Sequence, residues 1–387
     1  MDLLRKSLAI LAIATALGLI SLGCAPEREA PTDASAADIP VGVFAGLTGP
    51  TATFGQATRD GATLAAEEIN AAGGVLGRKI RLLIEDNQGR PDEAASVVTK
   101  LITANEVIAL IGENASNRSL AAAPIAQAHQ TPMISPSSTN PEVTRKGDYI
   151  FRVCYTDPYQ GAAIAAFTRR NLGFERVAIL KDLKNDYSIG LAEFFGEAFR
   201  KSGGSIVADQ SYSEGDNDFR SQLTAIARAK PQAIFIPGYY TDVGSIAIQA
   251  RDLRIDLPLI GGDGWDSPKL LEIGGSALEG AYFANHYFVG EDRPAVRNFV
   301  DKFRRKHGRD PDAVNALSYD ATRILADAIA RAGSLDRKAI RDEIARTKEF
   351  AGVAGVITMG EDRNPVKPVA MLKIEKGEIG LSDWIQP

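Results

Sequence analysis

Short apolar runs alternate with longer amphipathic segments along most of the chain. Residues 39–46 (IPVGVFAG) have the composition of a buried strand, and residues 57–74 carry alanines and Ile69 at helical spacing before the pair Gly73-Gly74. The alternation continues, with strands expected at 79–86, 107–112 and 132–135 and helices at 91–105 and 119–130. Strands that alternate with helices predict a parallel sheet covered by helices on both faces.

The same alternation begins again after the apolar run 149–155. Strands are expected at 176–182, 205–212, 232–238 and 257–262, and helices at 159–173, 189–204, 219–230 and 242–253. The chain therefore predicts an α/β fold with two doubly wound parallel-sheet lobes of similar size.

The C-terminal part has a different pattern. Residues 279–288 predict a strand and a crossover, and residues 367–379 a hairpin-like pair. Three helices are expected between them, at 295–308, 312–333 and 337–350. Three helices with few strands do not form a third doubly wound domain, so we expect them to complete one of the two lobes. The chain would then cross between the lobes more than twice.

The N-terminus has the pattern of an export signal. Two basic residues precede an apolar stretch from Leu8 to Leu22, which is too short for a typical membrane span. Residues 20–24 resemble a lipobox, in which Cys24 becomes the lipidated first residue, although ordinary cleavage after a small residue is the alternative. We expect a signal peptide at 1–23 and a lipidated tether at 24–38. The body would then be extracytoplasmic, in the periplasm or at the cell surface, and attached to the membrane through its N-terminal lipid only.

Composition narrows the classes of function. The formal net charge is −5 and no basic cluster with interleaved aromatic residues occurs, which argues against nucleic acid as a partner. Cys154 is the only cysteine besides Cys24 and lies in an apolar run typical of a core. The three histidines, His129, His286 and His307, lack zinc-site spacing, so each is interpreted as structural or solvent-facing. Because no nucleophile elbow, P-loop or dinucleotide motif is present, we expect neither a cofactor nor an enzyme.

Polar stretches follow several of the expected strands. Ligands of open parallel sheets bind beyond the carboxyl ends of the strands, so these stretches are the candidate site. They are residues 47–55, 113–119, 135–141, 184–188, 238–242 and 261–267. The hydroxyl trio Ser137, Ser138 and Thr139 could serve a ligand, or could form a turn and helix cap.

Two of these stretches carry a family resemblance. The body from Ile39 to Asn364 resembles the leucine/isoleucine/valine-binding proteins, which are type I periplasmic binding proteins of ABC transporters. The motifs are GLTGPTATFGQATRDGATLAAEEINAAGGVLGRKIRLLIEDNQGRPDEA at 46–94 and PMISPSSTNPEVT at 132–144. The resemblance implies two lobes joined by a three-stranded hinge, with lobe 1 at 39–157 plus 287–365 and lobe 2 at 158–286 plus 366–387.

The resemblance also assigns ligand-binding roles in the first lobe. Phe54 matches an aromatic residue that covers the ligand side chain, and Ser116 matches a serine that binds the carboxylate. Ser137 and Ser138 match two small residues whose backbone faces the ligand. Thr139 matches a threonine that holds both the carboxylate and the ammonium group.

In the second lobe, Tyr187 and Tyr239 match two tyrosines that close over the ligand. Asp263 matches an acid that pairs with the α-ammonium group, although the leucine-binding members have the longer glutamate there. Ser137-Ser138 stands where those members have Ala-Ala, and Trp265 lies next to the acid. These departures leave the ligand side chain open.

The family implies a monomeric substrate-binding protein of an ABC importer, with a small-molecule amino acid, branched-chain or related, as its ligand and the permease subunits as its partners. Ligand would bind between the lobes and favour their closure. The alternatives are a small amide, urea or an aromatic carboxylate in the same fold, a sensory binding protein, and a secreted hydrolase that uses Ser116 or Ser138.

Overall fold

The computed structural model describes residues 37–387. The expected signal peptide at 1–23, Cys24 and the tether up to residue 36 lie outside the described residues. Within residues 37–387, every helix is either too short or too polar to cross a membrane.

The first sheet contains five parallel strands in the order β2-β1-β3-β4-β5. The strands are β1 (Ile39–Ala45), β2 (Ile80–Asp86), β3 (Ala109–Ile111), β4 (Met133–Ser135) and β5 (Ile150–Arg152). The helices between them are α1 (Ala52–Ala71), α2 (Pro91–Thr103), α3 (Ser116–Ala128) and α4 (Glu142–Arg145). Helix α1 begins before the predicted residue 57, directly after the turn-forming pair Gly49-Pro50. Phe54 therefore lies in its first turn.

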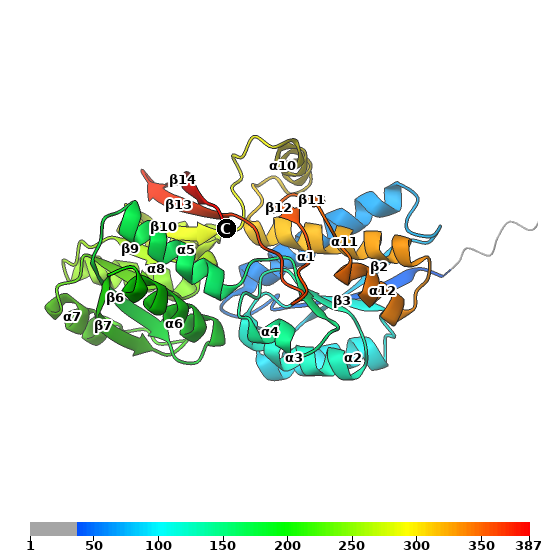
Figure 1. Ribbon diagram of the computed structural model, residues 1–387, viewed down its shortest axis with the longest axis horizontal. Helices are drawn as coiled ribbons and strands as arrows, with labels where there is room; N and C mark the ends of the chain where they lie inside the picture. Colours follow the sequence, from blue (N-terminus) through cyan, green and yellow to red (C-terminus); the bar gives the residue numbers. More distant parts are fainter. Residues whose placement is uncertain (1–36) are drawn as a thin grey trace, which may run out of the picture. The chain divides into compact units, whose positions relative to one another are not determined.

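The second sheet has seven strands in the order β14-β13-β10-β9-β8-β6-β7. The strands are β6 (Arg176–Asp182), β7 (Ser205–Tyr212), β8 (Ala233–Ile236), β9 (Leu259–Gly261), β10 (Tyr282–Asn285), β13 (Val369–Glu375) and β14 (Glu378–Ile385). The helices are α5 (Asp157–Arg170), α6 (Asp186–Lys201), α7 (Arg220–Arg228), α8 (Tyr240–Asp252) and α9 (Pro268–Gly274), together with the 3₁₀ turns η1 (Asp263–Trp265) and η2 (Gly275–Leu278). Strands β6 to β10 are parallel, as predicted. The C-terminal hairpin extends the sheet, with β13 antiparallel to its neighbour β10 and β14 antiparallel to β13 at the edge (Figure 1).

The three C-terminal helices pack on the first sheet. They are α10 (Pro294–His307), α11 (Ala313–Ala332) and α12 (Arg337–Ala345), and α11 lies along α1 (Figure 1). Phe299, Leu317 and Ile340 belong to the same buried cluster as Val41 of β1. Helix α12 ends at Ala345, before the predicted residue 350, where Arg346 with φ −85° and ψ 3° leaves the helical region. The chain continues into a small hairpin, β11 (Phe350–Gly352) and β12 (Gly355–Ile357).

The chain passes between the two sheet systems in three segments. They lie between β5 and α5, between β10 and α10, and between β12 and β13. The predicted architecture of two α/β units joined by a three-stranded connection is therefore confirmed.

Candidate functional site

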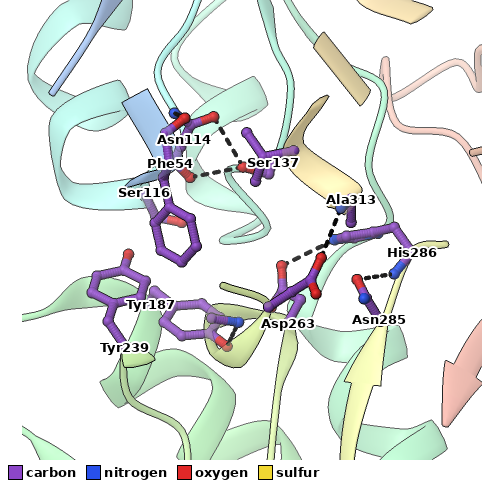
Figure 2. A pocket seen from close by; sticks show the side chains of 13 residues that line it. Phe54, Asn114, Ser116, Ser137, Tyr187, Tyr239, Asp263, Asn285, His286 and Ala313 are labelled. Atoms are coloured by element: carbon purple, nitrogen blue, oxygen red, sulfur yellow. Dashed lines mark hydrogen bonds and ion pairs between the residues drawn. The ribbon is translucent and has the colours of Figure 1, made fainter. Parts of the chain in front are cut away.

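A pocket lies where the loops at the carboxyl ends of both sheets meet (Figure 2). It encloses about 380 Å³, part of which is open to solvent. The first sheet system contributes Phe54, Asn114, Ser116 and Ser137, and the first turn of α11 contributes Ala313 and Val314. The second contributes Tyr187, Tyr239, Asp263, Gly264, Asp266, Asn285 and His286. Six of the eight ligand-binding residues that the sequence suggests thus share one pocket.

Hydroxyl groups form one wall of the pocket. Ser116 begins helix α3, and its Oγ accepts a hydrogen bond of 3.2 Å from the Asn140 backbone N–H. Ser137 Oγ lies 3.2 Å from Asn114 Oδ1. The partial positive charge at the N-terminus of α3 favours an anion beside Ser116. This wall therefore suits a carboxylate.

Ser138 and Thr139 lie behind this wall and do not line the pocket. The Ser138 hydroxyl is fully buried, lies 2.7 Å from Ser119 Oγ and donates to the Glu113 carbonyl at 2.9 Å. Thr139 is 1% exposed, and its Oγ1 has no hydrogen-bond partner within residues 37–387. Of the two serines that stand in place of the Ala-Ala pair, Ser138 forms hydrogen bonds within the protein, whereas Ser137 reaches the pocket.

The buried carboxylate of Glu113 holds the loop beneath Ser116. Its oxygens accept from the backbone N–H groups of Gly46 at 3.0 Å and Ala115 at 2.6 Å, and from Asn87 Nδ2 at 3.1 Å. Arg118 forms an ion pair with it at 3.5 Å. Because every partner is itself buried or lies in the backbone, this network fixes the loop conformation.

Aromatic rings form the second end of the pocket. Tyr187 and Tyr239 are stacked with centroids 5.4 Å apart, and Phe54 approaches Tyr239 edge-on at 5.7 Å (Figure 2). Tyr187 Oη accepts from the Gly264 N–H at 3.1 Å. Burial raises the pKa of both tyrosines above the ordinary value, so both hydroxyls remain neutral near pH 7. This end can cover an apolar side chain without adding charge.

The third part of the pocket is acidic. Asp263 follows β9, and its Oδ2 lies 3.0 Å from His286 Nε2 (Figure 2). Its side chain is 8% exposed, and Oδ1 has no hydrogen-bond partner in the described part of the chain. Trp265, which follows in sequence, is fully buried and donates to the Ile236 carbonyl at 3.0 Å. The tryptophan thus lies in the core and does not alter the pocket.

Four polar lining residues were not assigned a ligand-binding role from the sequence: Asn114, Asp266, Asn285 and His286. Asn114 and Asp266 lie within the predicted stretches 113–119 and 261–267, whereas Asn285 and His286 lie outside all of them. His286, which the sequence analysis interprets as structural or solvent-facing, is 1% exposed in its side chain and contacts Asp263. Asp266 Oδ2 accepts from the Ala313 N–H at 2.7 Å. Burial raises the pKa of Asp266, and the nearby negative charge of Asp263 adds to that shift. His286 could have been predicted as a site residue from its position directly after a strand, because β10 ends at Asn285.

Several contacts join the loops of the two sheet systems around the pocket. Tyr240 Oη donates to the Pro50 carbonyl at 3.1 Å, and Thr53 Oγ1 lies 3.0 Å from Ser267 Oγ. Asn140 of the hydroxyl loop donates through Nδ2 to the backbone carbonyl that precedes Tyr187, at 3.0 Å. The pocket is thus closed by contacts from both sides.

These features define a two-sheet protein with a ligand-sized polar pocket between its strand ends, and comparisons with known proteins agree. The family model for periplasmic binding proteins matches residues 38–378. The chain is 30% identical over 368 residues to the Leu/Ile/Val-binding protein BraC3 of Rhizobium johnstonii, covering 94% of this chain and 97% of that protein. The chain therefore belongs to the periplasmic binding protein family.

Solved structures agree with this assignment. The leucine-binding protein LivK of Thermotoga maritima is 40% identical with a TM-score of 0.87, over 90% of this chain and 99% of that chain. The branched-chain amino acid transporter substrate-binding protein LivJ of Streptococcus pneumoniae, solved with isoleucine, is 34% identical with a TM-score of 0.86, over 90% of this chain and 100% of that chain. The fold is thus the type I periplasmic binding fold.

Proposed function

We propose that the protein is the extracytoplasmic substrate-binding component of an ABC importer and that it captures an amino acid, branched-chain or related, between two closing lobes. Permease subunits would be its partners, and the protein would act as a lipid-anchored monomer. Relatives named as leucine/isoleucine/valine-binding or leucine-binding proteins, and one named as a branched-chain amino acid transporter substrate-binding protein, support this proposal.

The observation that carries the proposal is the state of Asp263. Its Oδ1 is buried in the pocket wall and lacks a partner within residues 37–387, while Oδ2 contacts His286. A buried charged oxygen without a hydrogen bond is costly, and a cation supplied by a ligand offsets that cost. An α-ammonium group is a cation of suitable size and supplies three donors.

The opposite wall supports the other half of a zwitterion. Ser116 and the N-terminus of α3 would bind the ligand carboxylate, and Thr139 Oγ1 would contribute from behind the wall. Ser137 and Ser138 would contribute backbone groups, while Phe54, Tyr187 and Tyr239 would cover the ligand side chain. Since desolvating both charges of an amino acid costs several kcal/mol, binding requires that both walls act together.

The proposed function includes a division into two lobes, with the bounds that the family resemblance implies. Residues 39–157 plus 287–365 would form lobe 1, and residues 158–286 plus 366–387 would form lobe 2. Ligand that touches both lobes binds the closed state better than the open state, so it shifts the hinge equilibrium toward closure. The hydrogen bond of Tyr240 to the Pro50 carbonyl across the two sheet systems supports such a closed state.

A thermal-shift screen of the purified protein tests the proposal. The panel comprises leucine, isoleucine, valine, alanine, phenylalanine, γ-aminobutyrate, urea, acetamide and benzoate. A ligand that binds only the folded state raises Tm with concentration, and stabilises by about 2.7 kcal/mol at 100 times its Kd. We expect at least one α-amino acid to raise Tm and urea, acetamide and benzoate to leave it unchanged. A shift by benzoate or an amide alone would assign a different ligand class.

A further inference from the structure

His286 lies at the acidic end of the pocket, and its only side-chain hydrogen bond within residues 37–387 is with Asp263. The imidazole Nε2 is 3.0 Å from Asp263 Oδ2, and the two side chains are 1% and 8% exposed. This contact holds one carboxylate oxygen and leaves Oδ1, which has no partner in the described chain, for a ligand. The direction of Asp263 therefore depends on His286.

The other ring nitrogen indicates the protonation state of His286. Nδ1 is buried and has no hydrogen-bond partner among residues 37–387, and the ring packs against Tyr155 with centroids 3.7 Å apart and an interplanar angle of 32°. A neutral imidazole with its proton on Nε2 fits these surroundings, since it donates to Asp263 and leaves Nδ1 without a proton. A doubly protonated ring would place a second N–H in a site that offers it no acceptor.

The groups around His286 shift its pKa in opposite directions. Burial and the Lys367 ammonium lower the pKa of His286 below 6.5, while Asp263 acts to raise it. The titratable and charged groups that face it or line the same cavities are Tyr155, Tyr187, Tyr239, Asp263, Asp266, Glu291, Arg293 and Lys367.

His286 also borders a second cavity. An outer groove of about 1080 Å³, part of which is open to solvent, is lined by Glu291, Arg293 and Trp384 among others, and His286 belongs to the lining of both this groove and the inner pocket. His286 thus lies between the ligand pocket and a groove that opens to solvent.

We propose that His286 is the positioning residue for Asp263 and that it makes ligand capture depend on pH, with strong binding while the imidazole is neutral and weaker binding once it is protonated. This inference rests on the proposed function. A neutral imidazole leaves the full negative charge of Asp263 for the ligand ammonium. A protonated imidazole satisfies that charge itself and repels the ammonium, so affinity falls as the pH drops through the lowered pKa of His286. By linkage, bound ligand must also lower the proton affinity of His286.

Calorimetric titration at pH 7.5 and pH 5.0 tests the inference in the wild type and in His286→Gln. The probe is leucine, or the amino acid of the screen that raises Tm most. A glutamine amide can still donate to Asp263 but does not titrate, so the Kd of each protein at pH 7.5 is the reference for its own pH dependence. Between pH 7.5 and 5.0, the wild-type Kd should rise at least about threefold more than that of His286→Gln. Buried acids such as Asp312, whose pKa is raised to about 7, titrate in both proteins, so their effects cancel when the two changes in Kd are compared.

His129→Gln is the matched control, because His129 is exposed and lies outside the pocket. It should retain the wild-type pH profile. If His286→Gln fails to fold, the proton shifts of the three histidines in the wild type provide the second test, and that of His286 should titrate at lower pH with ligand than without it. Equal pH profiles in wild type and His286→Gln, or a His286 titration that ligand leaves unchanged, would overturn this inference alone. Failure of every amino acid to bind at either pH would overturn the proposed function as well.

Discussion

The two polar walls of the pocket differ in how fully their groups are paired. In the hydroxyl loop, residues 135–141, the Ser135 and Ser138 hydroxyls both donate to the Glu113 carbonyl, at 2.6 and 2.9 Å. In the acid wall, which we define as Asp263, Asp266, Asn285 and His286, Asp263 Oδ1 and His286 Nδ1 are buried without partners in the described chain. The serine hydroxyls of the loop are thus paired within the protein and only Thr139 Oγ1 is left without a partner in residues 37–387, whereas the acid wall contains charged or titratable groups that a ligand or a proton can satisfy.

This difference assigns distinct roles to the two walls. A wall whose serine hydroxyls are hydrogen-bonded is held in one conformation before ligand arrives, so it sets the shape of the pocket at little cost on binding. A carboxylate oxygen without a partner gains most from an added cation, so it supplies discrimination. Substitutions in the hydroxyl loop should thus change stability, whereas substitutions in the acid wall should change affinity.

The largest expected effect is that of Asp263→Asn. The amide oxygen can still accept from His286, so the fold should be retained, but the negative charge that would receive the ligand ammonium is lost. We expect leucine affinity to fall about 100-fold or more, because removing one partner of a buried charge pair costs about 2–5 kcal/mol. Calorimetry measures the loss, and an unchanged Tm of the ligand-free protein serves as the control. Retained affinity would remove Asp263 from the binding role.

The next largest effect should come from Ser138→Ala, which removes a fully buried hydroxyl bonded to Ser119 and Glu113. The free energy of unfolding should fall by about 1–2 kcal/mol, since the Glu113 carbonyl and Ser119 lose a partner, while leucine affinity changes little. Ser137→Ala is the matched variant, because Ser137 lines the pocket and makes only long contacts. Chemical denaturation should show a smaller loss for it. The opposite order would contradict the contrast between the walls.

Tyr240→Phe tests the contacts that join the two sides. The variant loses the hydroxyl that donates to the Pro50 carbonyl at 3.1 Å and accepts from the Thr53 N–H at 3.4 Å. A net hydrogen bond is worth about 1 kcal/mol, so we expect affinity about fivefold lower and a larger radius of gyration without ligand in X-ray scattering. Tyr282→Phe in β10, outside the pocket lining, should leave both quantities unchanged.

The smallest expected effect concerns the pH dependence of stability. Burial raises the pKa of Asp312 to about 7, and the nearby Asp266 adds to that shift. The folded protein holds this proton more tightly than the unfolded chain, so the resulting stability is present below the unfolded pKa of 3.8 and lost as the pH rises through about 7. Asp312→Asn retains an N-cap for α11 and removes the titration. Its Tm should fall less between pH 5.0 and 8.0 than the wild-type Tm, by at least about 2 °C.

Most of the fold could be predicted from the sequence, because hydrophobic periodicity determines which residues face a core. The strand expected at 205–212 coincides with β7, and the C-terminal helix expected at 312–333 is close to α11. The ends of elements were less predictable, as α12 shows, because a helix stops where one residue such as Arg346 leaves the helical region. The antiparallel placement of β13 beside β10 depends on contacts distant in sequence.

The candidate site could be predicted only as a set of loops. Its location after strand ends follows from the topology of parallel sheets, and Ser116, Tyr187 and Asp263 all lie there. Which side of a loop a hydroxyl faces is decided by neighbours such as Ser119, so the inward bonding of Ser138 could not be foreseen. The role of His286 was missed for a similar reason, since its partner lies in another loop.

A calorimetric comparison of two ligands and two proteins tests whether Asp263 receives the ammonium group of an amino acid. Leucine and 4-methylpentanoate, which is leucine without its amino group, are titrated into the wild type and Asp263→Asn. We expect the wild type to bind leucine at least about 100-fold more tightly than the analogue, and this preference to fall to less than about tenfold in the variant. An analogue that binds the wild type as tightly as leucine does, or a preference that Asp263→Asn leaves intact, would contradict this role of Asp263.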